Sequence, residues 1–241
     1  MSSFELDPRH DADELAARFA RDGRVTIDGL IQPDQALTLH RQLRARDDWR
    51  QVIITGEKLV ELDRATRAGL TREQQDALDQ AVYAGARTGF QARYEAIRVP
   101  DAERDRAASD DPLAGLAAWL SAGNTRDFLR TVTGEPDIAF ADAQGTAYSP
   151  GDFLTGHDDA VEGKHRVAAY VFGLTPTWRI EWGGLLMFHE AEGTMGTFIA
   201  PGFNQLNLFR VGQQHSVSEV TRAAAYRRYS VTGWLRCSAA G

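Results

Sequence analysis

The sequence predicts an α+β protein with a mainly β core, an antiparallel barrel or jelly roll that carries N-terminal helices on one of its sheets. Two features of the chain lead to this fold class. Apolar residues follow a helical period through most of the first half, and short β-rich runs separated by Gly and Pro follow after about residue 137. With 241 residues, of which 43% are hydrophobic, the chain is long enough to bury one sizeable core. We therefore expect one domain over residues 1–241, with mainly helical support in 1–136 and the β core in 137–241.

The helices of the first half are predicted from apolar spacing and from residues that favour helix ends. Gly23 ends the first helix, Pro33 lies near the start of the second, and Thr71 with Gln74 forms a capping-box pattern before the third. A break near Gly123 divides the last helical segment into two short pieces. The predicted elements are a helix at 11–23, a strand at 24–31, a helix at 32–48, an extended segment at 48–63 and helices at 71–99 and 111–134.

The second half is predicted to consist of short strands joined by turns. Pairs of turn-forming residues separate the runs, as at Pro150 with Gly151 and at Gly183 with Gly184. Short strands at regular spacing are typical of an antiparallel sandwich or barrel, and the chain shows no internal repeat that would favour another architecture. The predicted strands lie within residues 137–148, 166–175, 183–189, 203–211 and 227–236.

The composition narrows the classes of partner and compartment. The formal net charge of −7 gives no support to broad electrostatic capture of nucleic acid or of an anionic membrane. Cys237 is the only cysteine, so one chain cannot build a disulfide or a thiolate metal cluster. The charged N-terminus lacks the apolar segment of a signal peptide, and no apolar run approaches the roughly 20 residues that span a bilayer. We expect a cytoplasmic protein whose partner is neither nucleic acid nor a membrane.

His157 and Asp159 form the one His-x-Asp pair of the chain and are candidate metal ligands. Two side chains that are two residues apart in a strand point to the same face, although such a pair also arises by chance. A mononuclear Fe(II) site needs two imidazoles and one carboxylate on one side of the metal. His215 is the candidate for the third ligand and His189 is its rival. Taken alone, His215 is better explained as a hydrogen-bonded polar residue at a strand end than as a metal ligand.

Arg228 and Ser230 form a second candidate feature, because they alternate on one face of a predicted strand. A guanidinium and a hydroxyl that point the same way suit a carboxylate ligand. The alternative is that Arg228, beside Arg227, is a solvated charge on an edge strand. The remaining histidines, His10, His40 and His165, are expected to be exposed and outside any site.

The patterns, in this order, resemble the 2-oxoglutarate- and Fe(II)-dependent dioxygenases, and within them the prolyl-hydroxylase-like subgroup. The resemblance rests on His157 and Asp159, on His215 followed by "SVSEV", and on "RRYSVTGW". It covers roughly residues 125–236 and includes "NTRDFLRTVTG" before the core and a Trp-containing loop with a Gly-Gly turn after the His-x-Asp pair. It implies a double-stranded β-helix (jelly roll) whose iron ligands are His157, Asp159 and His215.

The resemblance also implies which residues hold the co-substrate. Arg228 would pair with the far carboxylate of 2-oxoglutarate and complete the catalytic set, while Tyr148 and Ser230 would assist it. Thr232, on the same strand face, would line the site. Tyr148 taken alone also fits a core residue. Gly173 departs from the subgroup's pattern, because it occupies a position where some members carry an aromatic residue.

The implied activity is oxidative decarboxylation of 2-oxoglutarate to succinate and CO2, coupled to hydroxylation of a C–H bond. The implied cofactors are Fe(II), 2-oxoglutarate and O2, with stimulation by ascorbate as a further expectation. The implied substrate is a prolyl residue in a protein or peptide, bound at a rim formed by residues 178–182 and 58–63. Two alternatives stay open: a hydroxylase of a free amino acid or small metabolite, and a catalytically silent jelly-roll module that binds metal and carboxylate.

Overall fold

The computed structural model describes residues 4–55, 58–190 and 193–237. Its helices are α1 (Ala12–Asp22), α2 (Pro33–Ala45), α3 (Arg64–Ala68), α4 (Arg72–Ala86), α5 (Glu103–Ala107), α6 (Pro112–Leu120), α7 (Gly123–Thr133) and the short 3-10 helix η1 (Ile180–Trp182). Its strands are β1 (Arg24–Asp28), β2 (Arg50–Thr55), β3 (Lys58–Leu62), β4 (Gln91–Arg98), β5 (Ile138–Ala141), β6 (Gln144–Tyr148), β7 (Phe153–His157), β8 (Arg166–Leu174), β9 (Leu186–His189), β10 (Gly196–Ile199), β11 (Phe203–Arg210), β12 (His215–Val217) and β13 (Arg228–Cys237).

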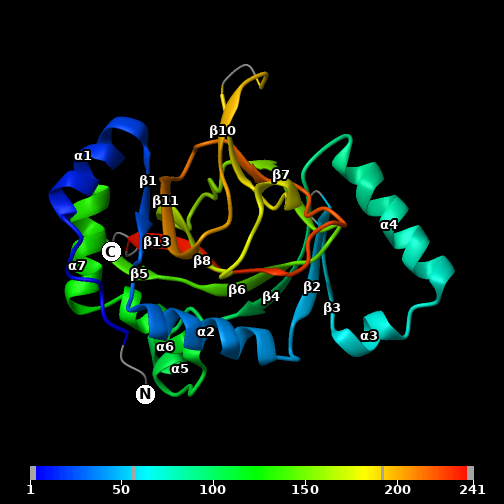
Figure 1. The fold of residues 1–241 in the computed structure, drawn as a ribbon, viewed down its shortest axis with the longest axis horizontal. Helices are drawn as coiled ribbons and strands as arrows, with labels where there is room; N and C mark the ends of the chain where they lie inside the picture. The colour runs from blue at the N-terminus through cyan, green and yellow to red at the C-terminus, as the bar shows by residue number, and fades with distance from the viewer. Residues whose placement is uncertain (1–3, 56–57, 191–192, 238–241) are drawn as a thin grey trace.

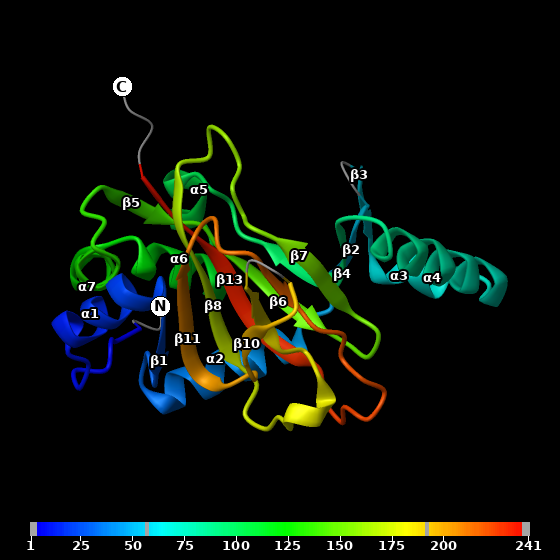
Figure 2. The same cartoon turned by 90° about the horizontal axis from the view of Figure 1, so that it is seen from above.

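The described strands form one antiparallel sheet that curls into a half-barrel (Figures 1 and 2). Its main path runs β1-β11-β8-β13-β6-β4-β7-β12-β9-β10, with the β2–β3 hairpin attached to β4 and β5 attached to β13. Strands of the second half pair with neighbours far along the chain, as β13 does with β6 and β8. This arrangement confirms the predicted class, a mainly β jelly-roll fold with helices.

The first half contributes strands as well as helices. β1 pairs with β11, and β4 lies between β6 and β7 near the middle of the sheet. In the segment predicted to be extended at 48–63, β2 pairs with β3, and residues 56 and 57 lie outside the described residues. One sheet therefore draws on both sides of residue 137, and the predicted division of the domain at that residue stays a prediction.

The helix predicted over residues 71–99 is about twice as long as the helix in the structure, which has 15 residues. The capping box of Thr71 and Gln74 is present and starts α4, but the helix ends at Ala86, and residues 91–98 form β4. A turn at residues 87–89 separates the two elements. β4 is buried along seven of its eight residues and is hydrogen-bonded on both sides, so sheet pairing overrides its helix-favouring composition.

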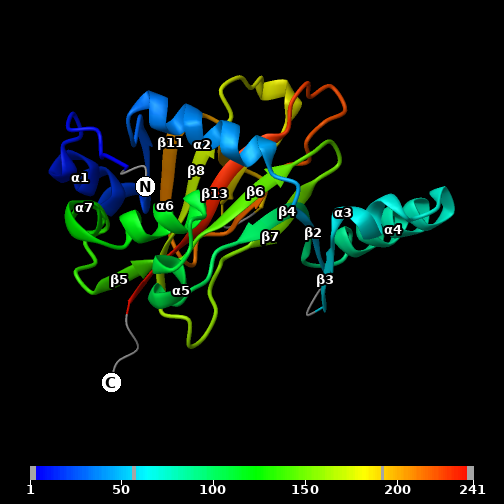
Figure 3. The ribbon, with the colours of Figure 1, turned by 90° about the horizontal axis from the view of Figure 1, so that it is seen from below.

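The helices α1, α2, α6 and α7 pack on the outer face of the sheet, and α2 crosses β8, β11 and β13 (Figure 3). The largest apolar cluster lies between these helices and the sheet and contains Phe19, Leu39, Trp49 and Phe172. The break that divides α6 from α7 near Gly123 is as predicted. Among the described residues, no helix is both long enough and apolar enough to cross a membrane.

Two histidines differ from their predicted exposure. His10 and His40 are half-buried rather than exposed, because both lie against the packed layers. A ring nitrogen of His10 lies 2.9 Å from the carbonyl oxygen of Gly29, and the ring of His40 stands edge-on against Tyr229. His165, in contrast, is exposed as expected.

Candidate metal and carboxylate site

Three predicted ligand residues meet on the concave side of the sheet. Asp159 Oδ1 lies 3.4 Å from His157 Nε2, and Asp159 Oδ2 lies 3.3 Å from His215 Nε2. One ligand atom from each residue lies within 4.8 Å of the others, so the three could hold a single metal ion. His157 and His215 are direct partners in the register between β7 and β12, which explains why residues far apart in sequence converge.

Asp159 reaches this cluster by a different route from the one predicted. β7 ends at His157, so strand alternation does not place the carboxylate. Instead Asp159 has φ = 63°, a left-handed conformation that Asp tolerates better than most residues. The turn brings its side chain back toward His157. The two side chains converge as expected, but the reason given by the strand pattern was wrong.

Hydrogen bonds hold both imidazoles with Nε2 toward the cluster. His157 Nδ1 lies 3.0 Å from the carbonyl oxygen of Thr155, and His215 Nδ1 lies 2.8 Å from that of Gln213. A carbonyl oxygen only accepts, so Nδ1 carries the proton and Nε2 offers a lone pair. This is the arrangement that fixes ring orientation and tautomer in metal-binding histidines.

The charge state of Asp159 also suits a metal ligand. Burial acts to raise the pKa of this carboxyl, but without a metal ion the two imidazoles can carry a proton on Nε2, and their hydrogen bonds and charge then outweigh burial and hold the pKa well below its usual value. The side chain is therefore ionised at neutral pH. Two imidazoles and one carboxylate are the donor set of non-haem Fe(II) sites, and these residues fit that ion.

His189 lies on the other face of the sheet from this cluster. Phe188, its neighbour in β9, is the register partner of His215, whereas His189 Nε2 lies 2.7 Å from the hydroxyl of Ser216. Successive side chains in a strand point to opposite faces, so His189 and Ser216 share the outer one. The geometry therefore separates His189 from the candidate ligands.

The cluster opens into a cavity of about 410 Å³ on the concave side of the sheet. Phe90 and Phe209 pack against the rings of His157 and His215. The walls are mainly apolar, with contributions from Ile54, Leu154, Leu186, Val161 and Val217. Among the described residues, the lining includes none of 58–63 or 178–182, the segments that were predicted to form a rim.

Arg228 lines the same cavity and is 4% exposed. It lies on β13 between β6 and β8, in the interior of the sheet, so the interpretation as a solvated edge-strand charge is wrong. In the described part of the chain no carboxylate forms an ion pair with it; its close neighbour is the ring of Tyr148, whose centroid lies 5.0 Å from the guanidinium carbon. Burial lowers the pKa of Arg228, as expected of a charge removed from water without a counter-charge.

Tyr148 is buried and also lines the cavity. It is the register partner of Arg228 and its ring stacks on Tyr94 with 5.3 Å between the ring centroids. Burial raises the pKa of Tyr148, so its phenol stays protonated and can donate a hydrogen bond. Tyr148 therefore packs in the core, as one interpretation of the sequence expected, and its place in the cavity wall leaves the co-substrate role a prediction.

Ser230 and Thr232 follow Arg228 on the same face of β13. Thr232 lines the cavity and accepts a hydrogen bond from Gln144. The Ser230 hydroxyl lies 2.8 Å from that of Thr146, and it is Thr146 that lines the cavity. Gly173 is the register partner of Ser230, and a Cβ at Gly173 would lie 2.2 Å from the carbonyl oxygen of Gly202. Close backbone approach, which an aromatic residue would prevent, explains this glycine.

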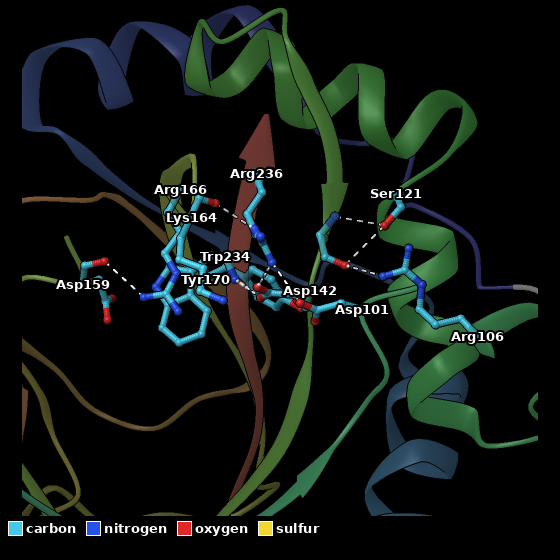
Figure 4. A network of polar contacts seen from close by, with 11 residues as sticks. Asp101, Arg106, Ser121, Asp142, Asp159, Lys164, Arg166, Tyr170, Trp234 and Arg236 are labelled. Carbon is cyan, nitrogen blue, oxygen red and sulfur yellow. Dashed lines mark hydrogen bonds and ion pairs between the residues drawn. The ribbon is translucent and has the colours of Figure 1, made fainter. Parts of the chain in front are cut away.

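Arg166 and Trp234 are cavity residues that the sequence patterns did not single out. Figure 4 shows Arg166 donating to the backbone carbonyl of Asp159, at 3.2 Å, while its guanidinium lies 3.5 Å from the centroid of the Trp234 ring. Beyond Trp234, the carboxylate of Asp142 accepts a hydrogen bond from the backbone N–H of Trp234. The backbone carbonyl of Asp142 accepts one from the Tyr170 hydroxyl. The alternation that led from Arg228 to Thr232 extends to Trp234 and would have found it; Arg166 had no such signal.

Comparison with known families gives one match. Residues 143–236, which carry all the candidate site residues, match the 2OG-Fe(II) oxygenase superfamily. Among curated protein sequences, no significant match to the chain is found.

Solved structures share the fold at low sequence identity. A prolyl-4-hydroxylase from Pseudomonas putida is similar at 17% identity and a TM-score of 0.55, over 95% of this chain and 100% of that one. A prolyl hydroxylase from Trichoplax adhaerens, in complex with a peptide fragment of hypoxia inducible factor, is similar at 13% identity and a TM-score of 0.58, over 94% of this chain and 89% of that one. An oxidoreductase of the 2OG-Fe(II) oxygenase family from Burkholderia pseudomallei is similar at 14% identity and a TM-score of 0.56, over 96% of this chain and 92% of that one.

Proposed function

Because residues 143–236 match the 2OG-Fe(II) oxygenase superfamily, we propose that the protein is a dioxygenase that couples decarboxylation of 2-oxoglutarate to hydroxylation of a C–H bond. One observation carries the proposal. Arg228 is buried without an ion-pair partner among the described residues, and it lines the same cavity as the His157, Asp159 and His215 cluster. A buried unpaired cation next to a metal-binding triad suits a ligand that has a carboxylate at one end and binds metal at the other.

His157, Asp159 and His215 would hold Fe(II), which supplies the activation of O2 when bound. The protein's own contribution is orientation. The backbone carbonyls of Thr155 and Gln213 hold both imidazoles with Nε2 toward the cluster, while the left-handed turn at Asp159 presents its carboxylate to the same point. These three residues would hold the ion at the cavity, where the co-substrate has room to bind.

Arg228 and Tyr148 would hold the far carboxylate of 2-oxoglutarate. The guanidinium supplies charge-assisted hydrogen bonds and the protonated phenol adds a neutral one. Thr232 lines the wall beyond them, and Ser230 would act by orienting Thr146 rather than by touching the co-substrate. Apolar walls such as Leu186 and Phe209 exclude water from the reacting groups.

The substrate we propose is a prolyl residue in a protein or peptide. The fold likeness to the two prolyl hydroxylases, one of them solved with a bound peptide, supports this choice over a free amino acid or a small metabolite. The intact triad and Arg228 favour an enzyme over a silent binding module. Stimulation by ascorbate belongs to the same proposal.

Absorption spectroscopy and product analysis test the proposal in sequence. Fe(II) and 2-oxoglutarate added without oxygen should give a weak visible charge-transfer band. The Arg228→Met variant should need a far higher concentration of 2-oxoglutarate than the unaltered protein to give the same band. Air and proline-containing peptides, with and without ascorbate, should then give succinate and peptides heavier by one oxygen atom. The proposal fails if neither the band nor succinate forms; oxidation of a free amino acid but of no peptide would overturn the substrate alone.

A further inference from the structure

A second cavity lies on the outer face of the sheet, behind the strand that carries Arg228. Its volume is about 440 Å³, close to that of the concave cavity. Its walls come from α2, from the segment after β8 and from the residues around the start of β13. Arg228 faces the concave cavity, whereas its neighbours Arg227 and Tyr229 line the outer one, as strand alternation requires. The two cavities are therefore distinct sites on opposite sides of one strand.

The outer cavity is positively charged. Arg44 and Arg227 line it, and no carboxylate does so in the described part of the chain. Arg227 donates from one Nη to Glu95, which is not a lining residue, while its Nε is buried without a hydrogen-bond partner. Arg44 is exposed and forms no ion pair with any described residue. In a chain of net charge −7, the wall of this cavity thus carries two guanidinium groups, of which Arg227 is paired with Glu95 and Arg44 has no ion-pair partner among the described residues.

The floor of the cavity combines aromatic rings with one neutral imidazole. Tyr229 and Tyr226 line it, and the His40 ring stands edge-on against Tyr229 with 5.7 Å between ring centroids. Burial, and then the charge of Arg44, lower the pKa of His40, so its ring is neutral at pH 7. His40 Nδ1 is buried and has no hydrogen-bond partner among the described residues. The floor therefore offers flat aromatic surface beside the two guanidinium groups of Arg44 and Arg227.

We propose that the outer cavity binds a small organic anion, a carboxylate or phosphate carried on a flat apolar body. Arg44 and Arg227 would hold the anionic group, because planar guanidinium groups match both oxyanions. Tyr226 and Tyr229 would contact the flat body through their rings. This site has no part in the proposed oxygenase chemistry and stands or falls separately from it.

Calorimetric titration of the purified protein tests the site with four probes: phenyl phosphate, benzoate, inorganic phosphate and uncharged benzamide. The protein is loaded with Fe(II) and saturating 2-oxoglutarate under argon, so that the concave cavity is filled. Phenyl phosphate or benzoate should bind at one site per chain, and the tighter of the two identifies the oxyanion. Benzamide and inorganic phosphate should each bind at least about tenfold more weakly, since each lacks one half of the ligand.

Three variants locate the binding. Arg44→Ala should weaken binding of the anionic probe at least about tenfold, because charge-assisted hydrogen bonds are lost. Arg41→Ala is the matched control: this arginine is exposed on the same helix but does not line the cavity, and its loss should change affinity less than about twofold. Arg228→Met, titrated without 2-oxoglutarate, should bind the probe like the unaltered protein.

Some outcomes would overturn the assignment. Saturable binding to neither aromatic anion would remove the site, and an equal effect of Arg41→Ala would reduce it to general surface charge. Loss of binding in Arg228→Met would move the probe into the concave cavity. Equal affinity for inorganic phosphate would remove the role of the aromatic floor.

Discussion

Replacing Arg228 by Met should have opposite effects on co-substrate binding and on the stability of the unliganded protein. The guanidinium is almost fully buried, no described carboxylate pairs with it, and burial lowers its pKa. Met has a similar length and carries no charge. The substitution therefore removes both the anchor for a carboxylate ligand and the unfavourable burial of an unpaired cation.

The two magnitudes follow from the geometry at Arg228. Losing one partner of a buried charge pair costs about 2–5 kcal/mol, which corresponds to about 30-fold to several thousand-fold weaker binding of 2-oxoglutarate. Removing a buried charge in favour of an apolar side chain should raise the free energy of unfolding of the unliganded protein by roughly 1–4 kcal/mol.

Denaturant unfolding under argon, with Fe(II) and with or without 2-oxoglutarate, measures both effects. The unaltered protein should gain about 2.7 kcal/mol at a co-substrate concentration of one hundred times its Kd, and the variant should gain less than about 0.9 kcal/mol at that concentration. Arg227→Met is the control next in sequence. It leaves Glu95 with Arg67 as its remaining ion-pair partner, so it should lose stability yet keep the response to 2-oxoglutarate. An Arg228→Met protein that is less stable when unliganded, or that responds like the unaltered one, would refute the reasoning.

Three further predictions concern the metal cluster, a close backbone approach and a buried carboxyl. His157→Ala should abolish tight Fe(II) binding, measured by metal titration, whereas His189→Ala on the opposite face should retain it. Gly173→Ala should lower the free energy of unfolding by roughly 1–3 kcal/mol, because the new Cβ would press on the backbone. Burial raises the pKa of Asp152 to about 6, so this group binds its proton more tightly in the folded state. Its contribution to stability is therefore lost as pH rises from about 4 to about 6, by roughly 3 kcal/mol at full ionisation, and Asp152→Asn should remove that part of the pH dependence of unfolding.

The controls and adverse outcomes differ for each. Normal Fe(II) affinity in His157→Ala would remove His157 from the proposed ligands. Loss of Fe(II) binding in His189→Ala would make His189 a ligand in place of His215. Gly115→Ala, in α6 with no atom near the added Cβ, should stabilise by about 0.5–1 kcal/mol, and a similar gain at Gly173 would show that the backbone yields there. Identical pH profiles for the Asp152→Asn and unaltered proteins would place the carboxyl's pKa near its ordinary value.

The residue patterns were most informative where local physics decides the outcome. Alternation along residues 227–236 placed Arg228, Ser230 and Thr232 on one face without any structure, because the strand period is two. The capping box at Thr71 started a helix for an equally local reason. Where local preference and sheet pairing compete, as in residues 91–98, the pattern predicted helix and the neighbouring strands imposed β4.

The sequence by itself determined the order of the chemically distinctive residues and the kind of ligand that each suits. It indicated a jelly roll, a His-Asp-His cluster and an arginine for a carboxylate, and it left His215 weighed against His189. Only the tertiary structure shows that His215, and not His189, lies beside His157, because the register of β12 against β7 and β9 sets which imidazole shares its face. Burial of Arg228, the turn at Asp159 and the outer cavity likewise depend on contacts between segments far apart in the chain, and no local pattern carries that information.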